Sequence, residues 1–120
     1  MGQNLSAGAQ QEIAILTMAR RKVDRIHGLT EQFAVAKPGA AQDQLGSMIS
    51  RAALELGRAL LAAGMGVIAD QASQLGMLAR RGGGPTIKLR GMRDFVAQLR
   101  PALDRAERAV LDRERAEHTQ

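Results

Sequence analysis

The chain has 120 residues, a length that fits one domain of ordinary size. It contains no cysteine, which excludes disulfides and thiolate metal sites, and its only aromatic residues are two phenylalanines. Seventeen Lys and Arg against twelve Asp and Glu give a formal net charge of +5, which favours nucleic acid, acidic proteins or anionic lipid as partners without choosing among them.

The apolar residues available for a core are mostly small. Hydrophobic residues make up 45% of the chain, but twenty-one of them are alanine, and Leu, Ile, Val and Phe together number 27. Such a core buries less area per residue than one with aromatic rings, which bury roughly 150–250 Å² each. We therefore expect an isolated chain to be marginally stable, and association with a copy of itself or a protein partner to supplement the core.

The first predicted helix spans residues 11–36 and follows an expected flexible arm, residues 1–10, which lacks apolar periodicity. Apolar side chains recur in this helix at steps of three and four residues, the spacing of one helix face. These positions are Leu16, Ala19, Val23, Ile26, Thr30 and Phe33. The helix should end at residues 37–39 (Lys-Pro-Gly), because proline disfavours a helical conformation at the residue before it.

A second helix is predicted over residues 43–80, with two stripes along its length. The apolar stripe consists of Leu45, Met48, Ile49, Ala52, Leu56, Leu60, Ala63 and Val67. The adjacent stripe consists of small residues, namely Gly46, Ser50, Ala53, Gly57 and Gly64. Because glycine inside a helix costs about 1 kcal/mol relative to alanine, we interpret the small stripe as a helix–helix interface where backbones approach closely.

The segment Gly64–Gly66 leaves two alternatives for this element. A break there would divide it into two shorter helices. An unbroken helix would be ~60 Å long at about 1.5 Å per residue, and it would outrun the first helix by several turns. The apolar surface exposed in that case favours oligomerisation.

The last helix is predicted over residues 87–117, after a glycine-rich basic loop at residues 81–86. Its apolar residues again recur at steps of three and four: Leu89, Met92, Val96, Leu99, Leu103, Ala106 and Val110. Pro101 lies inside this run, where a proline removes a backbone hydrogen bond and kinks a helix. The apolar phase is the same on both sides of Pro101, so we expect one kinked helix.

The end of this helix carries opposite charges four residues apart, as in Asp104 with Arg108 and Arg113 with Glu117. Such local pairs are typical of a solvated helix face. Together the elements predict an all-α fold: an antiparallel bundle of three long helices, or four if the second breaks, with coiled-coil-like packing. A single domain over residues 11–118 is expected.

Two basic clusters are candidate contacts for nucleic acid or another anion. The first consists of Arg20, Arg21, Lys22 and Arg25, and the second of Arg80, Arg81, Lys88, Arg90 and Arg93. The second cluster flanks glycines 82–84, and loop amides and guanidinium groups both present N–H donors to an anion. The glycine-rich loop is therefore either a binding site or only a joint.

The first six residues, MGQNLS, match the M-G-x-x-x-[ST] pattern of N-myristoylation, which would place an acyl chain on Gly2. One acyl chain gives only marginal membrane binding, so the basic residues of 20–25 would supply a second signal. A membrane is an expected partner only if Gly2 is acylated. The longest uncharged apolar run, residues 59–69, is shorter than the ~20 residues of a spanning helix, and no signal peptide is recognised, so we expect a cytoplasmic or host-delivered protein.

We expect no enzymatic activity, no cofactor and no metal site. With two His, four Ser and no Cys, a nucleophile with its base and orienting group is hard to assemble. The favoured function is interaction, as a scaffold, adaptor or subunit of a larger assembly that self-associates or binds a protein partner through helix faces. The alternatives are a regulator or packaging protein that binds nucleic acid through the Arg clusters, and an acylated membrane-associated protein.

Overall fold

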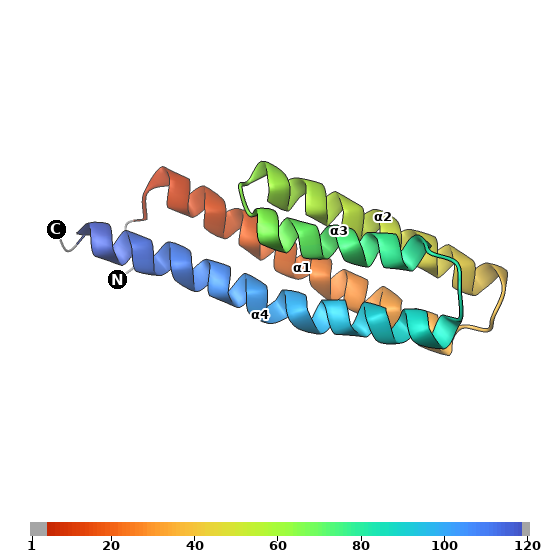
Figure 1. Ribbon diagram of the computed structural model, residues 1–120. Helices are drawn as coiled ribbons and strands as arrows, with labels where there is room; N and C mark the ends of the chain where they lie inside the picture. Colours follow the sequence, from red (N-terminus) through yellow and green to blue (C-terminus); the bar gives the residue numbers. More distant parts are fainter. Residues whose placement is uncertain (1–4, 119–120) are drawn as a thin grey trace.

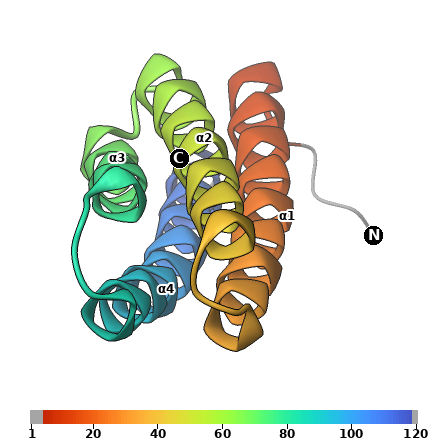
Figure 2. The same cartoon turned by 90° about the vertical axis from the view of Figure 1, so that its right-hand side faces the viewer.

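Within residues 5–118, the part of the chain that the computed structural model describes, the backbone forms four helices. They are α1 (Ala7–Val35), α2 (Ala40–Ala62), α3 (Gly66–Arg80) and α4 (Pro85–His118). Both α1 and α3 pack against α2 and α4, and successive helices run antiparallel around one core (Figures 1 and 2). The rod measures 59 × 24 × 18 Å. The predicted all-α antiparallel bundle is confirmed in its four-helix form.

The apolar stripe predicted for the first helix is buried along its whole length, from Leu16 to Phe33. The helix begins earlier than predicted, at Ala7 rather than residue 11, because Ser6 caps it. The Ser6 hydroxyl accepts a hydrogen bond from the Ala9 amide at 3.1 Å, which satisfies one of the free donors of the first turn. Residues 7–10 were assigned to the flexible arm and belong instead to the helix.

A carboxylate from α4 completes this cap. Glu114, only 4% exposed, accepts a hydrogen bond from the Ser6 amide at 2.7 Å. In an ordinary capping box a glutamate three residues after the cap makes this bond, but that position is Ala9 here. The backbone hydrogen bond lowers the pKa of Glu114 below its usual 4.5. The start of α1 and the end of α4 are therefore fastened to each other.

The predicted second helix breaks into α2 and α3 at Gly64, whose φ of +79° is rare for any residue with a side chain. Two hydrogen bonds close α2: the Met65 amide donates to the Leu60 carbonyl at 2.9 Å, and the Gly64 amide donates to the Leu61 carbonyl at 3.0 Å. This is the Schellman pattern of a helix end. The chain then reverses direction, so the unbroken helix with an exposed apolar flank does not form. That flank was one reason to expect oligomerisation, and this reason does not apply.

The small-residue stripe of α2 contacts α3 of the same chain. A Cβ built on Gly57 would lie 3.2 Å from the carbonyl oxygen of Ala69, and one on Gly76 would lie 3.2 Å from that of Ser50. Both distances are shorter than ordinary packing of a Cβ allows, so the two backbones touch at their glycines. The buried members of the stripe are Gly46, Ser50, Ala53 and Gly57.

Two residues depart from the predicted stripes. Gly64 is exposed in the turn and takes no part in the helix–helix interface. Val67, placed in the apolar stripe of an unbroken helix, is 79% exposed because it begins α3 after the reversal.

Helix α4 begins at Pro85, two residues earlier than predicted, so the glycine-rich loop is residues 81–84 rather than 81–86. Proline suits the first helical position, where an N–H would lack a partner. Pro101 does not end the helix, and the prediction of one helix through it is confirmed. Both Pro101 and Ala97 are exposed, so water can bond the Ala97 carbonyl that the proline leaves without a donor.

Candidate anion-binding end of the bundle

A ladder of ion pairs joins α1 to α4 along the rod. Arg20 of α1 bridges Asp104 and Glu107 at 2.8 and 2.6 Å. The other rungs are Glu12 with Arg113 at 2.9 Å, Asp24 with Arg100 at 2.7 Å, and Glu31 with Arg93 at 2.7 Å. Together these ion pairs join four arginines to five carboxylates.

Two arginines of the predicted basic clusters, Arg20 and Arg93, form ion pairs within this ladder. The hydrogen bonds from Glu107 and Asp104 raise the pKa of Arg20, and the pair of bonds from Arg93 lowers the pKa of Glu31. Arg20 and Arg93 are thus held by carboxylates of the same chain and are not free donors for an external anion.

The excess positive charge gathers at one end of the rod. The loops 36–39 and 81–84 both lie there, as the end-on view in Figure 2 shows. The helix turns nearest these loops, residues 27–51 and 74–94, contain seven Lys and Arg but only three Asp and Glu. The basic residues are Lys37, Arg51, Arg80, Arg81, Lys88, Arg90 and Arg93; the acidic ones are Glu31, Asp43 and Asp94. We call this region the basic end.

Side chains rather than helix dipoles set the electrostatic field at the basic end. Two helices begin there and two end there, so their macrodipoles oppose one another. Lys37, Arg81 and Arg90 are exposed, and Lys88 is half-buried. None of these four has an ion-pair partner within residues 5–118. They are free to meet an external anion.

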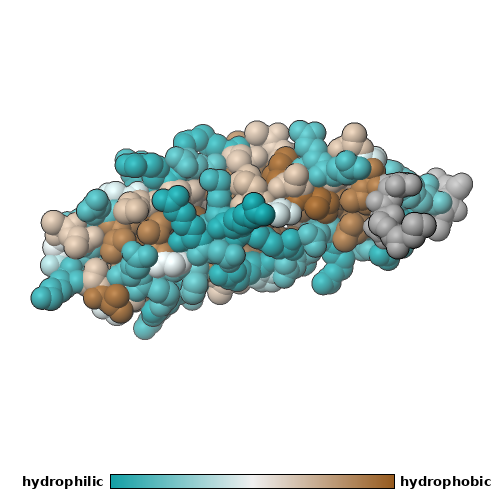
Figure 3. Space-filling model, turned by 180° about the vertical axis from the view of Figure 1, so that it is seen from behind, coloured by the Kyte–Doolittle hydropathy of each residue, from teal (hydrophilic) through white to brown (hydrophobic). Residues whose placement is uncertain are grey.

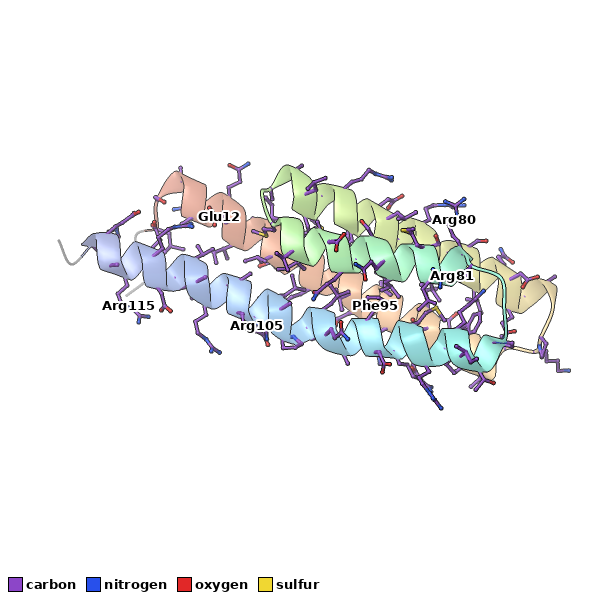
Figure 4. All side chains as sticks on the ribbon, viewed as in Figure 1. Glu12, Arg80, Arg81, Phe95, Arg105 and Arg115 are labelled. Carbon is purple, nitrogen blue, oxygen red and sulfur yellow. The ribbon has the colours of Figure 1, made fainter. Side chains whose placement is uncertain are left out.

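The two members of the Arg80–Arg81 pair diverge. Figure 4 shows Arg80 directed toward α2 and Arg81 toward α4. Arg80 lines a groove of about 300 Å³ between α2 and α3, together with Ser47, Ser50, Arg51 and Leu54. The sequence predicted Arg80 as an anion contact and Ser50 as an interface residue, but it gave no signal that they share a groove.

The first basic cluster lies in the middle of α1 and away from the basic end. Arg21 and Arg25 are exposed on its outer face, and Lys22 is half-buried. Because Arg20 is paired with α4, the four residues do not form one patch. The structure therefore does not join the two predicted clusters.

A second groove lies near the other end of the rod, between α1 and α2. It holds about 430 Å³ and is lined by Gly8, Gln11, Glu12, Ile15, Ala59, Ala62 and Ala63. In the view of Figure 3, apolar side chains gather beside hydrophilic ones on the back of the molecule. Leu61, which is 65% exposed, lies on the α3-facing side of α2, where it lines a smaller groove with Gly57, Arg58 and Ser73.

The described residues can also be searched for metal ligands and membrane-spanning helices. Within residues 5–118, no three His, Cys, Asp or Glu side chains are grouped as metal ligands, and no helix has the length and apolarity needed to cross a membrane. His27 is exposed. Gly2, the predicted acylation site, lies outside the described residues and stays a prediction.

Comparisons of the chain with protein families, with curated proteins and with solved structures returned no match.

Proposed function

We propose that this protein works by binding rather than by catalysis, and that its basic end binds a polyanion of the nucleic-acid class. The observation that carries the proposal is the segregation of charge. The basic end has an excess of four positive charges, while the rest of the chain has nearly equal numbers of both signs. A local excess of this kind attracts phosphate backbones and releases their counterions.

The surroundings of the two phenylalanines favour a duplex over a single strand. Phe33 is 3% exposed, and Phe95 is half-buried against the core. Phe33 is therefore closed to unpaired bases, and the partly covered ring of Phe95 offers them little area to stack on. Binding through Lys and Arg alone reads the phosphate backbone, and we expect it to be independent of sequence and strongly weakened by salt.

Fluorescence anisotropy with a labelled DNA duplex tests the proposal at about 50 mM and about 200 mM salt. One variant replaces Arg81, Lys88 and Arg90 with Gln. Its matched control replaces Arg21, Arg25 and Arg105, three exposed arginines outside the basic end, with Gln. Both variants lose the same formal charge, so any difference between them reports position rather than net charge.

We expect the basic-end variant to lose most of its affinity and the slope of log affinity against log salt to fall by up to about three units. The control should keep most of the affinity. Absence of binding by the wild-type chain at the lower salt concentration would end the proposal, and equal losses in the two variants would exclude the basic end as the binding surface.

Self-association is the second candidate, with a second copy of this chain as the partner. The specific observation is the exposed Leu61, which lines a groove between α2 and α3. Light scattering coupled to size exclusion should then give a dimer, and Leu61→Gln should convert it to a monomer. A wild-type monomer at high protein concentration would remove this candidate.

A further inference from the structure

We propose that the groove between α2 and α3 is a binding site for a phosphate monoester. The groove is lined by Ser47, Ser50, Arg51, Leu54 and Arg80, and no acidic side chain lines it. Arg51 and Arg80 belong to the basic end, but the proposal does not rest on polyanion binding, because Arg81, Lys88 and Arg90, which the polyanion test replaces, do not line this groove.

The Ser50 hydroxyl in this groove is unpaired. Ser50 is 2% exposed and lines the groove, and its Oγ atom has almost no solvent contact and no hydrogen-bond partner. A helical serine ordinarily bonds the carbonyl four residues earlier, as Thr30 does with Ile26 at 2.7 Å in α1. A buried polar group left without a partner is costly, and in native proteins it calls for an explanation. An oxygen of a bound ligand would satisfy the Ser50 hydroxyl.

The two arginines that line the same groove are also unpaired. Neither Arg51 nor Arg80 has an ion-pair partner within residues 5–118, whereas four arginines of the α1–α4 seam are all paired. Two guanidinium groups around one groove repel each other unless an anion lies between them. Both side chains are exposed and long, so they can move aside for a ligand and close on it.

The chemistry of the lining identifies the ligand class. Two guanidinium groups and two serine hydroxyls present many donors, which suit the three terminal oxygens and double charge of a phosphate monoester better than a carboxylate. The volume of about 300 Å³ exceeds the roughly 30 Å³ share of one water molecule about tenfold, so an organic group fits beside the phosphate. Leu54 offers that group an apolar contact.

Isothermal titration with inorganic phosphate and with glycerol 3-phosphate tests the site. Arg51→Gln and Arg80→Gln should each weaken binding about 10- to 100-fold, the loss expected for one charged hydrogen-bonding group. The matched control is Arg58→Gln, an exposed arginine two turns along the same helix, and its affinity should stay within about twofold of wild type. Binding should also weaken below about pH 6, where the phosphate loses one of its two charges.

Ser50→Ala separates a ligand role from a structural one. If the hydroxyl serves only packing, removing an unpaired polar atom leaves phosphate affinity unchanged. We expect instead that Ser50→Ala raises the midpoint of thermal unfolding and lowers phosphate affinity. Binding to phosphatidylcholine vesicles with and without phosphatidic acid distinguishes a lipid headgroup from a soluble ester.

Three outcomes would overturn the proposal: no binding of either phosphate probe, equal affinity in the Arg51, Arg80 and Arg58 variants, or unchanged affinity in Ser50→Ala. The variant with Gln at residues 81, 88 and 90 should keep its affinity for glycerol 3-phosphate. This result makes failure of the phosphate site distinguishable from failure of polyanion binding.

Discussion

Single residues fasten the helices of this bundle to one another and set how closely two of them pack. Glu114 supplies the carboxylate that caps α1 from another helix, and Gly57 lets α2 and α3 touch. Neither role was visible in the sequence, because each depends on an atom that lies far away along the chain. The sequence showed only a glutamate within a charged run and a glycine within a helix.

The Glu114 cap predicts a dependence of stability on pH. Because the pKa of Glu114 is lowered in the folded chain, its ionised form stabilises the fold above the unfolded pKa of about 4.5, and this contribution is lost as the pH falls through the folded value. Glu114→Gln should lower the free energy of unfolding at pH 7, and the deficit should shrink in acid. Urea unfolding across this range measures it, with the exposed Glu55→Gln as control; a deficit that does not vary with pH contradicts the assignment.

The close approach at Gly57 predicts opposite effects for two helical glycines. Leucine at position 57 must separate α2 from α3, because even a Cβ would meet Ala69, so we expect a loss of about 1–3 kcal/mol. Gly28 of α1 has no atom within 4 Å of such a Cβ, and Gly28→Ala should stabilise the chain by up to about 1 kcal/mol. Chemical denaturation of both variants checks this. Similar effects of the two substitutions would show that the interface is loose.

At the scale of elements, the periodic spacing of apolar residues predicted which helix faces are buried. It did not predict the helix break or the ion pairs between helices, because these depend on how the helices pack in three dimensions. The stripes of α1 and α4 are strongly periodic, and their residues are buried as predicted, except that Leu89 and Ala106 of α4 are only half-buried. The sequence did not decide between a broken and an unbroken helix at Gly64, because the apolar residues on both sides of Gly64 fit one continuous helical spacing. Two residues of the pairs predicted within α4 instead form ion pairs with α1, since Asp104 pairs with Arg20 and Arg113 pairs with Glu12.

The turn between α2 and α3 provides a direct test of why the second helix breaks. Gly64→Ala must place a side chain in the left-handed region, at a cost of about 1–2 kcal/mol. Gly66 lies two residues later, has no positive φ and has open space around it, so Gly66→Ala should be neutral or slightly stabilising. Thermal or urea unfolding of the Gly64→Ala and Gly66→Ala variants measures this difference in stability. Equal stability of the two variants would contradict the account of the turn.

At the scale of the whole molecule, the rod has two dissimilar ends. Ion pairs between α1 and α4 absorb the charge along the seam, and the unpaired basic side chains remain around loops 36–39 and 81–84. The sequence located the second Arg cluster and its net charge. It could not show that Lys37 and Arg51 join this cluster or that Arg20 and Arg93 leave it, because those facts follow from the antiparallel order of the helices.

Binding of a polyanion by the basic end can be tested by mapping backbone amide shifts with NMR during titration with a short DNA duplex. We expect the shifts to concentrate in residues 36–39 and 80–91, and the amides of the α2–α3 turn, which lies away from the basic end (Figure 1), to stay unchanged. The largest shifts at the α2–α3 turn, or no shifts at low salt, would contradict it.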